Sequence, residues 1–207
     1  MIDPNDVTKF DRTEDELLEF WLFCLFVRGK NADVQAKKLD AFVQNIRELN
    51  PDIPAGESLI TVLMLSSNRK IEAALRACKA GQYTTLVKAI SQTILHVGRY
   101  RMWLQTATVA ELQDLDGVGP KTARFFVLHS RPGVRVAVLD THILQYMAVR
   151  DGDGSIPKAT PTGARYAQLE EQFLTLADYE EVDPAAFDLA IWRANRARNP
   201  LAWRDYL

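Results

Sequence analysis

Residues 112–147 read LQDLDGVGPKTARFFVLHSRPGVRVAVLDTHILQYM, and this stretch decides how the whole chain is interpreted. The tripeptide GVG at 117–119 separates two short segments with helical apolar spacing, and Pro120 stands in the first turn of the second, where helices favour proline. Glycines lack a Cβ and let another molecule approach the backbone, while N–H groups at a helix N-terminus attract phosphate. The stretch predicts two helices joined by a hairpin turn at 108–129, although GVG alone is also an ordinary turn between packed helices. The residues expected to contact phosphate here are Gly117, Val118 and Gly119.

Two residues of this stretch carry possible catalytic chemistry. Lys121 lies in the first turn of the second helix, and a lysine amine can act as a nucleophile. Asp140 follows 19 positions later at the start of another expected helix, where it can cap through one oxygen and still present negative charge outward. Each residue alone is more often structural, as an extended surface lysine or a simple N-cap. Together with the hairpin, they form a candidate catalytic pair.

Apolar residues recur at helical spacing along nearly the whole chain, and no alternating strand pattern stands out. Thr13 with Glu16, and Thr108 with Glu111, have capping-box spacing, and the turn-rich segment 151–163 precedes a C-terminal pair of helices. The sequence therefore predicts an all-α fold. Helices are expected at about 13–29, 32–49, 59–65, 70–80, 84–97, 108–115, 121–129 and 140–149, and again after 163 with the last long one starting at Asp183-Pro184.

The composition is that of a globular protein. The chain has 207 residues, 47% apolar and 25% charged, which is enough to build a core without disulfides and excludes a disordered scaffold. Cys24 and Cys78 make no disulfide framework, and even with three histidines no zinc-site spacing appears. The first residues are acidic rather than basic, and no apolar run reaches membrane-spanning length. These features predict an intracellular, cytoplasmic protein with no membrane partner.

The net charge of −2 argues at first against a nucleic-acid partner, because such proteins are usually basic. The charge is unevenly distributed, however. Residues 1–20 hold seven acids and two bases, and residues 166–192 hold seven acids and no base, whereas residues 21–165 carry +7. The middle of the chain can therefore present a basic face to a polyanion, and a shallow salt dependence of binding is expected. The alternative is that the acidic segments are ordinary solvated surface.

The segments GVGPKTA at 117–123 and VLDTHI at 138–143, joined by RPGVRVA, resemble those of the helix-hairpin-helix (HhH-GPD) DNA glycosylase superfamily. The resemblance implies a single unit over 1–207, with two helical subdomains flanking a DNA-binding cleft. One subdomain is expected mainly from about 30–150 and contains the hairpin. The other is expected from about 1–29 together with about 160–207.

The resemblance also implies a reaction, in which Lys121 attacks C1′ of a flipped nucleotide and Asp140 supports departure of the damaged base. A Schiff base and β-elimination would follow, so the implied enzyme is a bifunctional DNA glycosylase/AP lyase of base excision repair. No cysteine follows Cys78, which excludes a four-cysteine iron–sulfur loop. The chain is most similar to short iron–sulfur-free 8-oxoguanine glycosylases, with endonuclease III-like features such as the sequence DTH at 140–142. Another modified base, such as an oxidised pyrimidine, and a catalytically silent DNA-binding module remain alternatives.

Further site residues come from the resemblance and from side-chain chemistry. The expected partner is double-stranded DNA with a damaged base, bound by a monomer, which implies association with the nucleoid. No cofactor is expected to be required, apart from a possible structural K⁺ or Na⁺ at the carbonyls of Gly117 and Gly119. Arginines expected at phosphates are Arg124, Arg131 and Arg135, and candidates to fill the hole left by the flipped base are Lys30 and Asn31. Candidate base-pocket residues are Gln35, Phe187, Asp188 and Trp192, against the alternatives of core aromatics and a solvated helix face.

Overall fold

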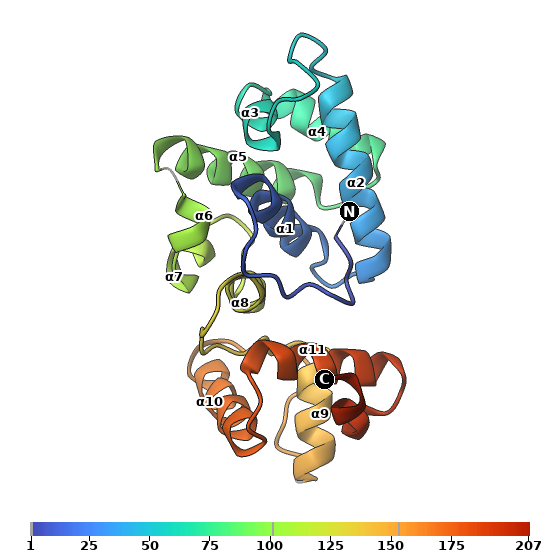
Figure 1. The fold of residues 1–207 in the computed structure, drawn as a ribbon, viewed down its shortest axis with the longest axis vertical. Coiled ribbons are helices and arrows are strands. Elements are labelled where there is room, and N and C mark those ends of the chain that lie inside the picture. Colours follow the sequence, from blue (N-terminus) through green and yellow to red (C-terminus); the bar gives the residue numbers. More distant parts are fainter. Residues whose placement is uncertain (1, 101, 153) are drawn as a thin grey trace. The chain divides into compact units, whose positions relative to one another are not determined.

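The structure is a computed structural model that describes residues 2–100, 102–152 and 154–207; Asp153 of the turn-rich segment lies outside this range. Every regular element in these residues is helical, and no strand occurs among them (Figure 1). The expected all-α class is therefore confirmed. No helix in the described residues is both long and apolar enough to cross a bilayer.

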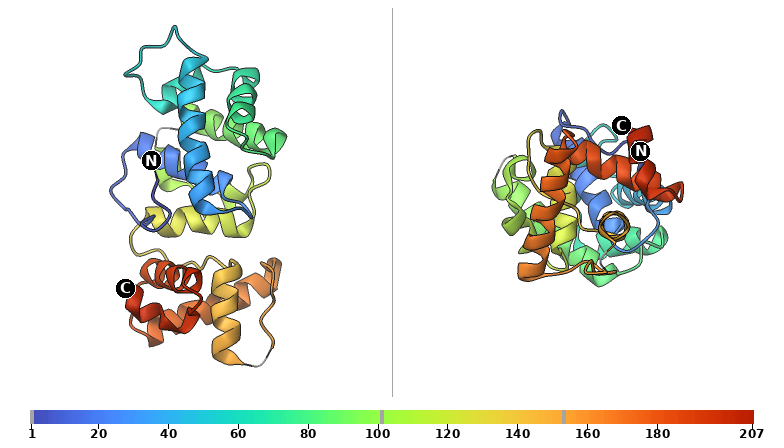
Figure 2. Two further views of the ribbon diagram at one scale, coloured as in Figure 1. Left: turned by 90° about the vertical axis from the view of Figure 1, so that its right-hand side faces the viewer. Right: turned by 90° about the horizontal axis from the view of Figure 1, so that it is seen from below.

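The chain divides into two compact units. The first contains residues 2–4 and 11–119, and the second contains residues 5–10 and 120–207. Helices of the first unit are α1 (Glu14–Phe26), α2 (Ala32–Glu48), α3 (Leu59–Met64), α4 (Asn68–Ala77), α5 (Tyr83–Arg99), α6 (Trp103–Thr106) and α7 (Val109–Gln113). Those of the second are α8 (Pro120–Ser130), α9 (Thr141–Asp151), α10 (Gly163–Tyr179), α11 (Pro184–Arg196) and the 3₁₀ helix η1 (Pro200–Tyr206) (Figure 2).

This division corrects the expected subdomains, because α1 does not belong with the C-terminal helices. Its sequence from Leu17 to Phe26 is almost wholly apolar, and its buried residues cover all sides of the helix. A helix that is apolar all round must be enclosed by other helices. In the first unit α1 packs against α2, α3, α5 and α6. Trp21 at its centre donates its indole N–H to Thr93 of α5 over 2.9 Å, so its polar atom is also satisfied.

The second unit has its own core, which places α9 with the C-terminal helices rather than with the N-terminal half. Tyr146 of α9, Phe173 of α10, and Phe187 of α11 are fully buried in one cluster that also contains Trp203 of η1. Residues 5–10 are hydrogen-bonded to this unit. The Lys9 N–H donates to the His129 carbonyl over 3.1 Å, and Arg193 Nε donates to the Asn5 carbonyl over 2.9 Å.

Helix starts follow the capping residues closely. The boxes at Thr13 with Glu16 and Thr108 with Glu111 are both formed, and Asn31 caps α2. Asp183 caps α11 with Pro184 in its first turn. These caps satisfy backbone N–H groups that a helix leaves without intrahelical partners. The N-cap assignments made from the sequence are thus confirmed.

Candidate functional site

The hairpin turn after α7 is tightly held within the first unit. The Val118 N–H donates to the Leu115 carbonyl over 3.0 Å, and the Asp116 N–H donates to the Gln92 side chain over 2.8 Å. Gly117 has φ +74°, and a Cβ built on it would lie 2.2 Å from Thr85 Cγ2. Glycine is therefore required at this position both for its backbone conformation and for space.

The Gly117 carbonyl already has a positively charged partner. It accepts a hydrogen bond from Nη1 of Arg28, the second residue after α1. A K⁺ or Na⁺ ion at the same oxygen would be repelled by this guanidinium. This contact disfavours a cation at the Gly117 oxygen, and the monovalent-cation site expected at Gly117 and Gly119 stays a prediction.

Lys121 and Asp140 lie together in the second unit, as expected of a reactive pair. Lys121 is in the first turn of α8, and its Nζ is 3.8 Å from Oδ2 of Asp140. Oδ1 of Asp140 accepts the N–H groups of His142 and Ile143 at 2.8 and 3.0 Å, which caps α9. One carboxylate oxygen is thus used to fix the side chain, and the other faces the lysine amine. The lysine side chain is 33% exposed and the aspartate 14% exposed, so the amine remains accessible.

Asp188 is buried beside this pair rather than on a solvated helix face. Its Oδ2 is 3.1 Å from Nε2 of the fully buried His129, whose Nδ1 is 2.7 Å from the Thr8 hydroxyl. The pKa of Asp188 is raised, chiefly because burial disfavours the charged carboxylate. The hydrogen bond and charge of His129 and the charge of Lys121 act in the opposite direction, whereas the charge of Asp140 raises the pKa further. The carboxyl of Asp188 therefore senses the charges of both candidate catalytic residues.

Gln35 of α2 is also buried, at 3% exposure, so the solvated-face alternative is wrong for it as well. Its Oε1, like Oδ1 of Asp188, is buried without a hydrogen-bond partner in the described structure. An unpaired buried acceptor costs free energy. Each of these atoms, in its own unit, can therefore accept a donor that the protein does not provide.

The two aromatic pocket candidates, Phe187 and Trp192, differ in burial. Phe187 is fully buried and packs against Phe173, Tyr146 and Trp203 at ring-centroid distances of 5.2, 5.6 and 4.7 Å. A stacking role for Phe187 is therefore wrong in this structure. Trp192 is half-buried, with the His142 ring edge-on at 6.2 Å, and stays a candidate.

Replacement of Phe187 with alanine is expected to lower the free energy of unfolding of the second unit by about 3–5 kcal/mol, because a large buried ring is lost. Urea unfolding followed by circular dichroism measures this loss, with Trp192→Ala as a control at a half-exposed ring. A Phe187→Ala protein with unchanged unfolding and impaired DNA cleavage would instead support the stacking role.

Two of the three arginines expected at phosphates are bound to carboxylates. Arg124 Nε donates to Glu170 over 2.7 Å, and its guanidinium lies 4.4 Å from the Tyr166 ring centroid. The Arg124 side chain is only 17% exposed. This geometry corrects the expectation that Arg124 contacts DNA. Arg135 pairs with Asp178 at 2.7 Å but remains largely exposed. Arg131 lies over the Phe126 ring at 6.0 Å.

Lys30 and Asn31 occupy the turn between α1 and α2. The Lys30 amine donates to the Ala80 carbonyl over 2.7 Å, and Asn31 is exposed while its side chain caps α2. The helix-end chemistry that was the alternative interpretation is therefore present. A role in filling a hole in DNA remains a prediction for both residues.

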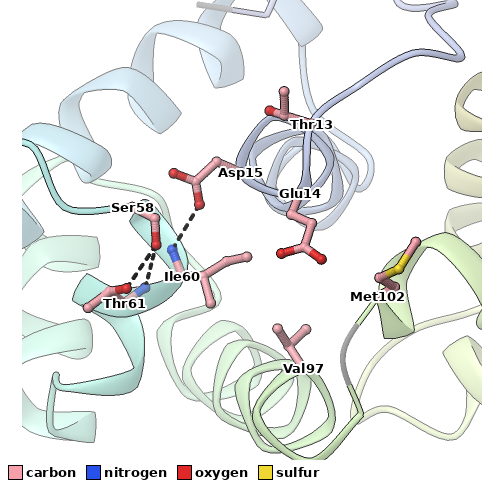
Figure 3. A pocket seen from close by; sticks show the side chains of 8 residues that line it. All are labelled: Thr13, Glu14, Asp15, Ser58, Ile60, Thr61, Val97 and Met102. Carbon is pink, nitrogen blue, oxygen red and sulfur yellow. Dashed lines mark hydrogen bonds between the residues drawn. The ribbon is translucent and has the colours of Figure 1, made fainter.

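A pocket of about 540 Å³ opens between α1, α3 and α5 of the first unit, and it does not suit a phosphate (Figure 3). The Glu14 carboxylate points into it, and Asp15 accepts the N–H groups of Leu59 and Ile60 at 2.8 and 3.2 Å. The helix N-termini that face the pocket are therefore already capped, and the pocket carries negative charge. Its lining residues are Thr13, Glu14, Asp15, Ser58, Ile60, Thr61, Val97 and Met102.

Comparisons with known proteins bear on the motif and on the fold. The family described as helix-hairpin-helix motif matches residues 104–124. The crystal structure of Methanocaldococcus jannaschii 8-oxoguanine DNA glycosylase superposes with a TM-score of 0.65 at 16% identity, over 93% of this chain and 84% of that one. The chain has the helix-hairpin-helix glycosylase fold. The M. jannaschii enzyme in complex with a 15mer DNA containing 8-oxoguanine gives a TM-score of 0.63 at 15% identity, over 92% and 85% of the two chains. No curated protein matches by sequence.

Within this glycosylase fold, sequence reasoning missed two features. One is Arg28, which lies 89 positions from its partner Gly117, and the other is the pairing of His129 with Asp188, 59 positions apart. An arginine immediately before Gly29 at a helix end was the only local hint of the first. No short sequence pattern indicates the pairing of His129 with Asp188.

Proposed function

We propose that the protein is a DNA glycosylase with AP-lyase activity that removes 8-oxoguanine from double-stranded DNA. The proposal depends chiefly on the different contacts of the two Asp140 oxygens. Oδ1 is fixed by two backbone N–H groups, and Oδ2 faces the Lys121 amine at 3.8 Å. A simple N-cap explains the first contact but does not require the second.

In the proposed reaction, the Lys121 amine attacks C1′ of a nucleotide turned out of the stack. The C1′–N bond to the base breaks, the base leaves with the electron pair and takes up a proton, and the attacking nitrogen loses one. Asp140 stabilises positive charge on the sugar and accepts the proton from the amine. Ring opening gives a Schiff base, loss of a proton from C2′ expels the 3′ phosphate, and water then releases the lysine.

The choice of 8-oxoguanine is supported by the fold shared with a glycosylase whose structure contains that base. The buried acceptor Oδ1 of Asp188, in the same unit as Lys121, is consistent with it, because a purine edge offers N–H donors to an acceptor of this kind. An oxidised pyrimidine also carries N–H groups and remains the alternative substrate.

Borohydride trapping tests the proposal. The protein is incubated with duplexes carrying 8-oxoguanine, thymine glycol or an abasic site, and we expect a covalent adduct with the first and third that disappears in Lys121→Gln. An adduct with thymine glycol in place of 8-oxoguanine would assign the other substrate. Tight binding with no adduct on any duplex would contradict the enzyme and favour a silent DNA-binding module.

A further inference from the structure

Arg28 connects the end of α1 to the hairpin turn using only main-chain oxygens. Its Nε donates to the Leu25 carbonyl over 2.8 Å, and its Nη1 donates to the Gly117 carbonyl. Its third nitrogen, Nη2, is buried and makes no hydrogen bond in the described part of the chain. Burial lowers the pKa of Arg28, but an arginine keeps its charge in proteins.

Two lysines of the same unit, like Arg28, donate to main-chain carbonyls. The Lys30 amine donates to the Ala80 carbonyl over 2.7 Å, and the Lys38 amine donates to the Lys79 carbonyl over 2.6 Å. Burial lowers the pKa of Lys30, and the charges of Lys38 and Arg28 lower it further. The amines of Lys30 and Lys38 thus lie on the neighbouring carbonyls of Ala80 and Lys79, and Arg28 is two residues from Lys30. These three cations are called here the Arg28 cluster.

No residue of the Arg28 cluster forms an ion pair with a carboxylate of the described residues. Other arginines of the chain do, since Arg76, Arg124, Arg135 and Arg204 pair with Glu72, Glu170, Asp178 and Glu180. Like charges without a counter-charge destabilise one another. Carbonyl oxygens orient the three cations but do not neutralise them, so the cluster has capacity for an anion.

We infer that the amines of Lys38 and Lys30 bind the phosphodiester backbone next to the phosphate held by the hairpin. Arg28, whose nitrogens are buried or bonded to carbonyls, adds its positive charge to this site and fixes the Gly117 carbonyl in position. The inference rests on the proposed function for its partner, DNA, but not for its chemistry. Lys30 was expected at DNA from the sequence, whereas Arg28 and Lys38 are assigned by the geometry. The cluster supplies positive charge in a chain whose net charge is −2.

The salt dependence of binding to an undamaged duplex tests this inference. Each phosphate neutralised contributes about 0.9 to the slope of log K against log salt concentration. Arg28→Gln and Lys38→Gln are each expected to reduce the slope by about that amount. Arg69→Gln, which removes the same charge from an exposed site in the first turn of α4, is expected to leave it unchanged.

Arg28→Lys separates charge from structure, because lysine keeps the charge but lacks the planar fork of donors that reaches both the Leu25 and the Gly117 carbonyls. We expect it to preserve the slope and to lower affinity at every salt concentration. A purely structural Arg28 would leave the slope unchanged in Arg28→Gln too. Lys38→Gln, at a surface amine, keeps the test decisive should Arg28→Gln fail to fold.

Slopes in Arg28→Gln and Lys38→Gln equal to that of Arg69→Gln would overturn the inference, as would a wild-type protein that does not bind duplex DNA. Failure of the proposed function is seen separately. In that case the borohydride adduct is absent while the slope changes persist.

Discussion

Asp140→Asn is expected to slow base excision on the order of 10²–10⁴-fold with little change in stability. Asparagine keeps an oxygen that can accept the N–H groups of His142 and Ile143, so the cap of α9 persists. What it loses is the negative charge 3.8 Å from the Lys121 amine. Without that charge, neither the attacking amine nor the developing positive charge on the sugar is supported.

Asp140→Ala is the matched variant, because it removes both the charge and the cap. Excision should fall as far as in Asp140→Asn, but the free energy of unfolding should also fall by about 1 kcal/mol. Single-turnover excision and urea unfolding measure the two effects. An Asp140→Asn protein within tenfold of the wild-type rate would remove Asp140 from the chemistry.

The parts of the fold that were predictable from the sequence are those determined by neighbouring residues. Thr13 and Thr108 open helices through capping boxes that lie within four residues, and Asp183 does so together with Pro184. Asp140 was expected to cap with one oxygen and present charge with the other, and the structure has this arrangement. Local hydrogen bonds of this kind depend little on the rest of the molecule.

Helix association was predicted less well, and α1 shows why. Its apolar residues specify that it is buried but not which helices enclose it, and resemblance placed it with the C-terminal segment. The run from Leu17 to Phe26 is apolar on every side and was itself a sign of a central helix. Contacts with α2, α3, α5 and α6 follow from that property.

Side-chain partners distant in sequence were not predictable. Arg124 was expected at a phosphate because it lies near the hairpin, yet Glu170, 46 positions away, binds it. The acidic segment 166–192 similarly provides Asp178 to Arg135 and Asp188 to His129. Much of the negative charge that argued against DNA is therefore used inside the second unit.

Gly117→Ala is expected to destabilise the first unit by at least about 1–2 kcal/mol, the cost of a left-handed conformation at a residue with a Cβ. Steric overlap adds to this, because the new Cβ would lie 2.2 Å from Thr85 Cγ2 and 2.9 Å from Arg28 Nη1. The arginine can shift at its flexible end, but the threonine methyl is fixed close to the backbone of α5. The turn must therefore move, and DNA affinity should fall with it.

The double variant Thr85→Ser/Gly117→Ala separates the two costs, since serine lacks Cγ2. It should regain the stability lost to steric overlap with Thr85 and keep the loss caused by the left-handed backbone, which gives a coupling free energy between two contacting residues.

Gly119→Ala supplies the second comparison, because no atom lies within 4 Å of a Cβ there and φ is not left-handed. It should leave urea unfolding unchanged and still weaken duplex binding by fluorescence anisotropy, because its methyl group would occupy the space through which a phosphate approaches. Unimpaired binding in Gly119→Ala would show that the phosphate does not approach at this glycine, and full stability in Gly117→Ala would contradict the clamped turn.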